Sequence, residues 1–212
     1  MIISASRRTD IPTYYSEWFF NRLKDGFVYV RNPMNIHQIS KIPLSPDVVD
    51  GIVFWTKNPT PMLNRLDELN QYIYYFQFTL NSYSVDVEPN IPSKNNIVIP
   101  TFQKLSQKIG KDKVVWRYDP IFIDDKYTVK YHLEQFEGIS AALQGYTKNC
   151  VISFLDLYQK VKRNFPEVKM VSKEQRKYLG QRMTRIATEH KMILRPCGEG
   201  TELAAFGADC NG

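Results

Sequence analysis

The 212-residue sequence lacks the segments that direct a chain into or across a membrane. No apolar run approaches the roughly 18 residues of a membrane-spanning helix. The N-terminus reaches Arg7 and Arg8 without the apolar stretch of about 7–15 residues that a secretory signal contains. These absences predict a cytoplasmic protein with no membrane partner.

Cysteine is scarce and widely spaced. Cys150, Cys197 and Cys210 form no CxxC or CxxxC pair, which argues against a self-contained zinc or iron–sulfur site. An odd number of cysteines in a cytoplasmic chain also argues against structural disulfides, so we expect free thiols and no metal site.

Histidine is equally scarce. His37, His132 and His190 fall in an expected loop, a helix and a helix end rather than at strand ends. This placement argues against a nucleophile relay or zinc site built on histidine. We expect all three side chains at the surface.

A glycine-rich phosphate loop is also missing. No GxGxxG or GxxxxGK(S/T) pattern follows an expected strand, which argues against dinucleotide-binding and P-loop folds. The composition, 43% hydrophobic and 24% charged, predicts one ordinary core and a single domain over residues 1–212. The aromatic residues of segment 14–20 fit a core-facing helix stripe.

Apolar strands alternate with helices of apolar 3.6-residue spacing along the whole chain. This alternation predicts parallel strands with right-handed crossovers, hence an α/β fold. The expected strands are 2–6, 27–30, 51–55, 72–80, 114–118, 150–157 and 192–195, and the expected helices are 13–23, 58–70, 97–109, 129–143, 173–190 and 202–206. About seven βα units favour a TIM-like (β/α) barrel one unit short of closure. The alternative is an open, doubly wound sheet.

Each expected strand runs into polar residues at its carboxyl end, where α/β enzymes place their sites. Asp119, Asp156 and Glu199 are the candidate catalytic residues, as a general base or ligands of a divalent metal. The candidate substrate-binding residues are Arg7, Arg8, Asp10, Arg31, Lys57, Arg117 and Arg195. Arginines that converge there would bind a phosphate or carboxylate, so a small anionic substrate is expected. The alternative is a salt-bridge lattice that closes the barrel mouth.

The net charge of +6 and the pI of about 9.1 suit an anionic partner. Basic residues concentrate in segment 160–177, which allows a nucleic-acid-binding surface or, more commonly, a solvated face. The sequence indicates no particular oligomeric state.

Several motifs in order resemble one bacterial family, domain-of-unknown-function family 1848. They are the segments SASRRTDIP (4–12), VRNP (30–33), LSPD (44–47), FWTKNP (54–59), WRYDP (116–120) and SFLDLY (153–158). The resemblance covers essentially the whole chain and brings no settled activity.

Members of that family look like longer proteins whose C-terminal cysteine cluster is similar to that of radical S-adenosylmethionine enzymes. The resemblance implies a 4Fe-4S cluster and S-adenosylmethionine in full-length members. This sequence stops at Gly212 without a CxxxCxxC loop, so no cofactor is evident in it, and either the chain is cut short or this member has lost the cluster.

Three functions follow from these observations. The first is radical chemistry on an anionic substrate in the full-length protein. The second is a cluster-independent lyase or hydrolase that acts on a phosphorylated or carboxylated substrate. The third is a nucleic-acid-binding module.

Overall fold

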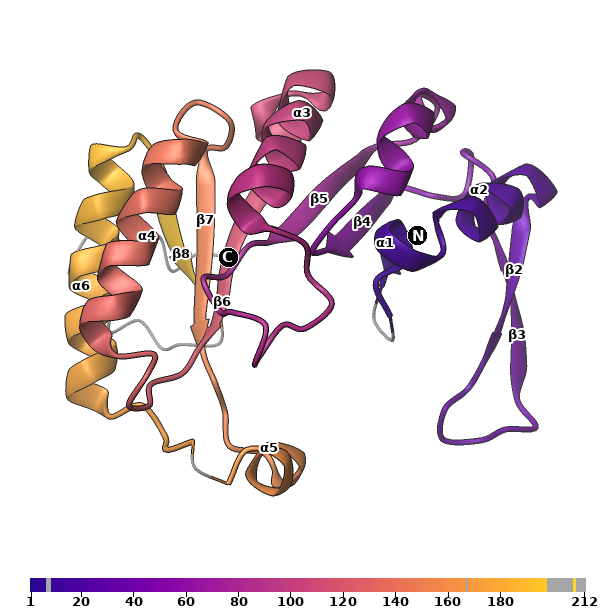
Figure 1. Ribbon diagram of the computed structural model, residues 1–212. Helices are drawn as coiled ribbons and strands as arrows, with labels where there is room; N and C mark the ends of the chain where they lie inside the picture. The colour runs from indigo at the N-terminus through magenta and orange to yellow at the C-terminus, as the bar shows by residue number, and fades with distance from the viewer. Residues whose placement is uncertain (7–8, 167, 198–207, 209–212) are drawn as a thin grey trace. The chain divides into compact units, whose positions relative to one another are not determined.

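The computed structural model describes residues 1–6, 9–166, 168–197 and 208 (Figure 1). Six strands form one sheet in the order β1-β4-β5-β6-β7-β8, and two form a separate antiparallel pair, β2 and β3. The pairs β1/β4, β6/β7 and β7/β8 are parallel. The predicted α/β class with parallel strands is therefore confirmed.

The predicted TIM-like barrel is wrong. The sheet is open, because β1 and β8 stand at the two ends of the strand order and are not paired with each other. One physical reason is that the expected strand 27–30 does not join the parallel sheet. It is β2 (Phe27–Arg31), which pairs with β3 (Ile39–Pro43) as a two-stranded ribbon. The described part of the chain therefore supplies six parallel strands instead of seven.

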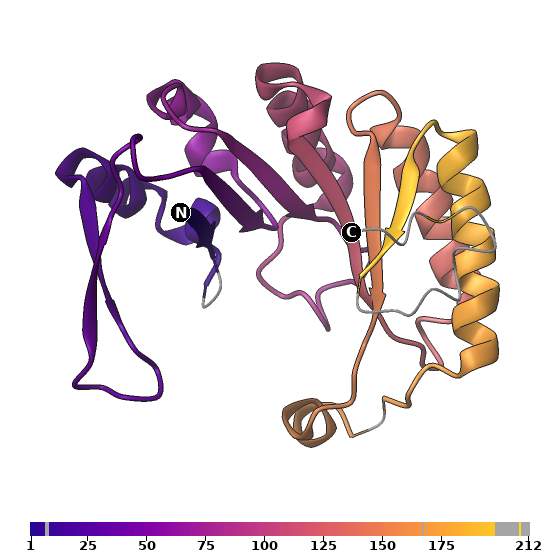
Figure 2. The same cartoon turned by 180° about the vertical axis from the view of Figure 1, so that it is seen from behind.

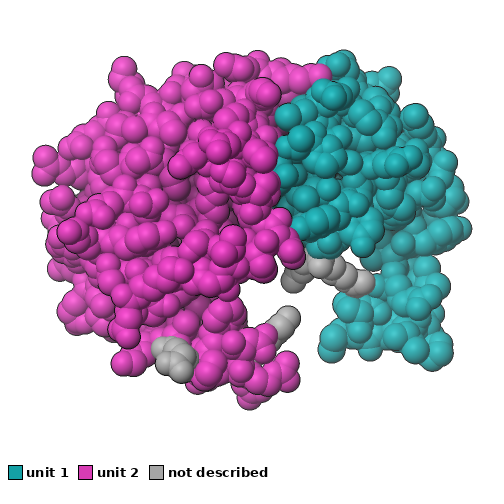
Figure 3. Space-filling model, viewed as in Figure 1, with its two compact units in different colours: residues 1–77 teal, residues 78–212 magenta. Residues whose placement is uncertain are grey.

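The chain divides into two compact units, residues 1–77 and 78–212 (Figure 3). Unit 1 contains β1 (Ile2–Ala5), α1 (Ile11–Tyr14), α2 (Ser16–Asp25), β2, β3, β4 (Gly51–Thr56) and the 3-10 helix η1 (Thr60–Leu69). Strand β5 (Tyr74–Thr79) spans the boundary. Each unit is described by itself below.

The core of unit 1 forms on one face of β4. Ile52, Phe54 and Thr56 are buried and alternate with half-exposed residues. Phe54 packs edge-on against Phe19 of α2, with ring centroids 5.3 Å apart. The expected aromatic core stripe in segment 14–20 is right for Phe19 and Phe20 and wrong for Tyr14, Tyr15 and Trp18, which are 58%, 50% and 43% exposed.

Unit 2 contains η2 (Lys94–Val98), α3 (Ile99–Ile109), η3 (Lys111–Lys113), β6 (Val114–Ile121), α4 (Val129–Leu143), β7 (Asn149–Phe154), α5 (Gln159–Asn164), α6 (Lys173–Glu189) and β8 (Ile193–Pro196). Helices α4 and α6 lie side by side along the strands of this unit (Figures 1 and 2). Trp116 of β6 stacks on Phe136 of α4, with centroids 4.9 Å apart. Among the described residues, no helix has the length and apolar character needed to span a membrane.

Local sequence explains where the long helices of unit 2 begin. Thr128 caps α4 by accepting a hydrogen bond from the Tyr131 N–H. Ser172 and Gln175 form a reciprocal capping box at the start of α6. The expected helices 129–143 and 173–190 are confirmed to within one residue, whereas the expected helix 202–206 lies outside the described residues.

Candidate functional site

The carboxyl end of β6 holds a buried ion pair. Arg117 and Asp119 are two residues apart in the strand, so their side chains project from the same face. The Arg117 Nε donates to both Asp119 carboxylate oxygens at 3.1 Å, and its NH2 group also donates to Oδ2. The two residues are only 7% and 9% exposed. This arrangement fixes the plane of the guanidinium group.

Burial alone would lower the pKa of Arg117, because it disfavours the charged form. The hydrogen bond and charge of Asp119 outweigh burial, with a further contribution from the Cys197 side chain, so the pKa is raised. Arg117 therefore keeps its positive charge although it is buried.

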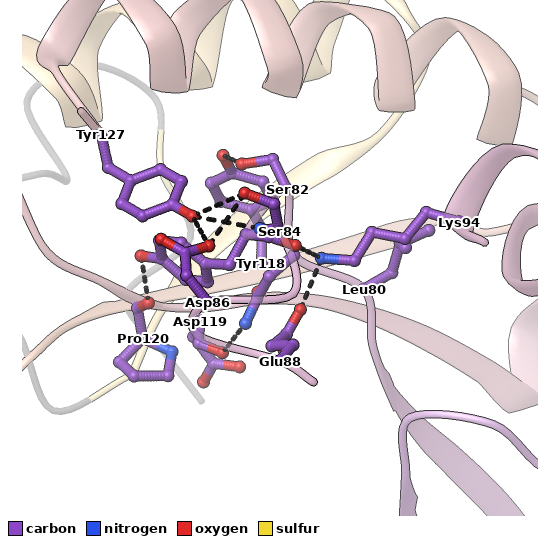
Figure 4. A network of polar contacts seen from close by, with 12 residues as sticks. Leu80, Ser82, Ser84, Asp86, Glu88, Lys94, Tyr118, Asp119, Pro120 and Tyr127 are labelled. Atoms are coloured by element: carbon purple, nitrogen blue, oxygen red, sulfur yellow. Dashed lines mark hydrogen bonds and ion pairs between the residues drawn. The ribbon is translucent and has the colours of Figure 1, made fainter. Parts of the chain in front are cut away.

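The neighbouring strands contribute polar groups to the same place. The Ser153 hydroxyl of β7 lies 3.4 Å from Asp119 Oδ2. The Asn81 amide, just beyond β5, donates to the Asp119 carbonyl oxygen at 2.9 Å. Figure 4 shows Asp119 and Leu80 in this region. Asn81 is 3% exposed, and its Oδ1 atom has no hydrogen-bond partner among the described residues.

The other predicted site residues of unit 2 are less tightly held. Asp156 is exposed, and its Oδ2 accepts a hydrogen bond from the Tyr158 hydroxyl at 3.2 Å. The Arg195 Nε of β8 donates to the Asn149 side chain at 3.0 Å, toward the amino end of β7. Glu199 lies outside the described residues. Of the three candidate catalytic residues, only Asp119 is therefore described as buried and in contact with other polar side chains.

In unit 1, Asp10 is the centre of a second polar cluster. One carboxylate oxygen accepts from the Thr13 N–H at 2.9 Å and so caps α1. The other accepts from the Thr56 hydroxyl at 3.1 Å and the Lys57 backbone N–H at 2.7 Å. These contacts connect the start of α1 to the end of β4. A carboxylate with these three donors has a structural role that needs no ligand.

Four predicted substrate-binding residues of unit 1 remain. Lys57 is half-exposed and directly follows β4. Arg31 is exposed at the end of β2, in the antiparallel ribbon rather than at the end of a parallel strand. Arg7 and Arg8 lie outside the described residues.

No group of three or more His, Cys, Asp or Glu side chains among the described residues is placed to hold a metal ion. Cys150 is completely buried in β7, and burial raises the pKa of its thiol, whereas Cys197 is exposed just beyond β8. Cys210 lies outside the described residues. An iron–sulfur cluster needs three or four thiolates, so the two described cysteines do not fit one.

The prediction that all histidines lie at the surface is wrong for His132. Its side chain is completely buried in α4, where the Nδ1 atom lies 2.9 Å from the Tyr118 hydroxyl. Sequence reasoning missed Asn81, Tyr118 and His132, although Tyr118 stands between Arg117 and Asp119. Strand alternation places Tyr118 on the opposite face, toward the helices.

Comparisons with known proteins add a family and a weak structural likeness. No curated protein matches the sequence. A crystal structure of a putative alpha-L-fucosidase from Bacteroides thetaiotaomicron matches with a TM-score of 0.42 and 9% identity, over 98% of this chain and 84% of that chain. The family model described as Domain of unknown function (DUF1848) matches residues 2–212. The chain therefore belongs to the DUF1848 family, as its motifs predict.

Proposed function

We propose that unit 2 carries an enzyme site for a small anionic substrate, phosphorylated or carboxylated, at the carboxyl ends of β6 and β7. The observation that carries this proposal is the buried Arg117–Asp119 pair beside Ser153. Removing two charges from water costs several kcal/mol per ion, by order of magnitude, and a well-packed apolar pair would often be at least as stable. A binding role explains why this buried strand carries two charged residues.

Arg117 is the binding group in this proposal and Asp119 positions it. Guanidinium groups bind phosphate and carboxylate in a planar, two-pronged geometry. A guanidinium whose plane is already fixed loses less conformational freedom when it binds an anion. Asp156, which is exposed, is the carboxylate proposed as general base or metal ligand. The contacts of the described residues support the anion-binding part of the proposal. They do not bear on the radical chemistry that the family resemblance implies.

Calorimetric titration with inorganic phosphate and with citrate tests the proposal. Arg117→Lys keeps the charge but loses the planar fork, so we expect binding at least about tenfold weaker, on the scale of one charge-assisted hydrogen bond. The matched control is Arg185→Gln, because Arg185 is an exposed arginine of the same unit. Equal affinity in the wild type and Arg117→Lys, with both folded by circular dichroism, would overturn the assignment.

Nucleic-acid binding is a second candidate, favoured by the surface around α5. Tyr158 and Phe165 are 67% and 44% exposed, and they flank the exposed basic residues Lys162 and Arg163. Aromatic residues interleaved with basic ones are typical of single-strand binding surfaces.

Fluorescence anisotropy with a labelled oligothymidylate distinguishes the two candidates. We expect binding that weakens with added salt and is lost in the double variant Lys162→Glu, Arg163→Glu. Arg182→Glu plus Arg185→Glu makes the same charge change on α6 and serves as control. Binding that resists salt, or that both double variants lose equally, would remove this candidate.

A further inference from the structure

A cavity lies in unit 2, lined by residues other than Arg117 and Asp119. It is a partly open pocket of about 340 Å³ between the loop that follows β5 and helices α3 and α4. Ser82, Glu88 and Lys94 line it from the loop and η2, and Gln135 lines it from α4. Apolar side chains, among them Ile99 of α3 and Ile139 of α4, also line it, together with the polar residues Ser84, Ser93 and Asn95. A cavity of this size is at the small end of the range for ligand sites.

The charges that line the cavity cancel. Glu88 and Lys94 are the two charged residues of its lining, and they pair with each other. Their side chains are only 8% and 20% exposed. The Lys94 ammonium group also donates to the Tyr83 carbonyl oxygen, as Figure 4 shows beside Glu88. An ionic ligand would lose part of its hydration in this pocket without meeting a net opposite charge, which is unfavourable.

A chain of three hydrogen bonds connects the cavity wall to the interior. The Ser82 hydroxyl lies 2.7 Å from the Tyr118 hydroxyl (Figure 4). The Tyr118 hydroxyl lies 2.9 Å from His132 Nδ1, and His132 Nε2 lies 2.8 Å from the Phe122 carbonyl oxygen. Tyr118 is 1% exposed and His132 is completely buried.

The carbonyl at the far end fixes the direction of every proton in this chain. A carbonyl oxygen only accepts, so His132 Nε2 carries the proton and the neutral ring accepts at Nδ1. Burial lowers the pKa of His132, which keeps the ring neutral. Tyr118 must then donate to Nδ1, and its oxygen accepts from Ser82. Ser82 uses its own hydroxyl proton in the bond to Tyr118, so its oxygen remains a hydrogen-bond acceptor at the cavity wall.

We propose that this cavity binds a small neutral ligand whose hydroxyl group donates a hydrogen bond to Ser82 Oγ while its apolar face packs on Ile99 and Ile139. A monosaccharide and a nucleoside share this chemistry, since both present hydroxyl donors on a ring with apolar C–H surface. The site is independent of the anion site at Arg117.

Saturation-transfer NMR with four probes tests the proposal. The neutral probes are methyl glucoside and adenosine, and the charged counterparts are glucose 6-phosphate and adenosine monophosphate. We expect at least one neutral probe to bind this cavity more tightly than its phosphate does. Binding of methyl glucoside alone identifies a sugar site, and binding of adenosine alone identifies a nucleoside site. Failure of both neutral probes overturns the proposal, and so does tighter binding of the phosphates that the cavity-blocking variant Val85→Trp abolishes; phosphate binding that survives Val85→Trp belongs to the anion site.

Variants assign the binding to this cavity. Ser82→Ala removes the acceptor and should weaken the neutral probe about three- to tenfold, the usual effect of one uncharged hydrogen bond. Val85→Trp places a large ring at the mouth and should abolish binding; Val85 is 72% exposed, so the fold should tolerate it. Ser153→Ala is the matched control at the other site. Unchanged binding in both Ser82→Ala and Val85→Trp would overturn the assignment.

A nitrogen-15 NMR measurement of the His132 ring tests the hydrogen-bond direction separately. We expect the tautomer protonated at Nε2. Protonation at Nδ1 would reverse the chain and turn Ser82 into a donor, which would overturn the proposed ligand chemistry. Neither result depends on Arg117, so this proposal and the anion site can fail independently.

Discussion

Asp10 in unit 1 and Asp119 in unit 2 are both aspartates at the carboxyl end of a strand region, yet their environments differ. Asp10 is half-exposed and its oxygens accept from two backbone N–H groups and one hydroxyl. Asp119 is 9% exposed and binds a buried guanidinium with both oxygens. The residue type and position are alike, but one carboxylate holds the backbone together and the other holds a charged side chain in place. The proposed anion site is built on the second arrangement.

Replacing Asp119 should have the largest effect. Asp119→Ala leaves the Arg117 charge buried without this partner, which typically costs about 3–5 kcal/mol of unfolding free energy. Urea denaturation followed by circular dichroism measures the loss. Replacing both residues, as Arg117→Met with Asp119→Leu, should recover most of it, because an apolar pair carries no desolvation penalty. A double variant as unstable as Asp119→Ala would show that the pair is not the cause.

The Asp10→Ala variant should lose less, about 1–2 kcal/mol, the usual cost of removing a helix cap. Asp10→Asn should retain most of the stability, because an amide oxygen can still accept from the Thr13 N–H. The same urea experiment measures both variants. If Asp10→Ala proved as costly as Asp119→Ala, the contrast between the two aspartates would be lost.

The pH dependence of stability should come partly from His132 of unit 2. Burial lowers the pKa of this histidine in the folded state below its ordinary value of 6.5. As the pH falls through 6.5, the unfolded chain binds a proton that the folded chain does not bind. The free energy of unfolding therefore declines below that pH and keeps its full value above it. His132→Gln should flatten this decline in urea denaturation between mildly acidic and neutral pH. An unchanged slope would assign the dependence to other groups.

The smallest effect should come from an exposed ion pair. Arg185 and Glu189 on α6 are paired at 2.9 Å with side chains 73% and 53% exposed. Arg185→Gln should therefore change the unfolding free energy by no more than about 0.5 kcal/mol. A larger loss would mean that charge pairs matter in unit 2 regardless of burial, which would weaken the argument from Asp119.

Local sequence patterns predicted the helices and strands well, but they did not predict which distant strands pair with one another. The helix over Val129–Leu143 was predictable because its cap and its apolar spacing lie within the segment itself. The strand over Ile39–Pro43 was not, because it is mostly exposed and lies among prolines that suggest a loop. Barrel closure depends on which distant strands pair, a property that no single segment encodes.

The candidate site shows the same limit. The Arg117–Asp119 pair was predictable, because strand alternation alone places residues two apart on one face. The hydrogen bond from Asn81 to the Asp119 carbonyl joins residues 38 positions apart. The chain from Ser82 to His132 depends on how α4 packs on β6. Such contacts become visible only in the folded structure.

The ribbon of β2 and β3 has a consequence for the local unfolding of unit 1. Its strands pair only with each other among the described elements, and Tyr29 and Ile39 on them are 62% and 55% exposed. An isolated two-stranded ribbon is marginally stable in water, so its amide protons should exchange with solvent long before those of β6 and β7. Limited proteolysis would then cut first in segment 32–38, which would make this ribbon the natural place to insert a tag or label without disturbing the two proposed sites of unit 2.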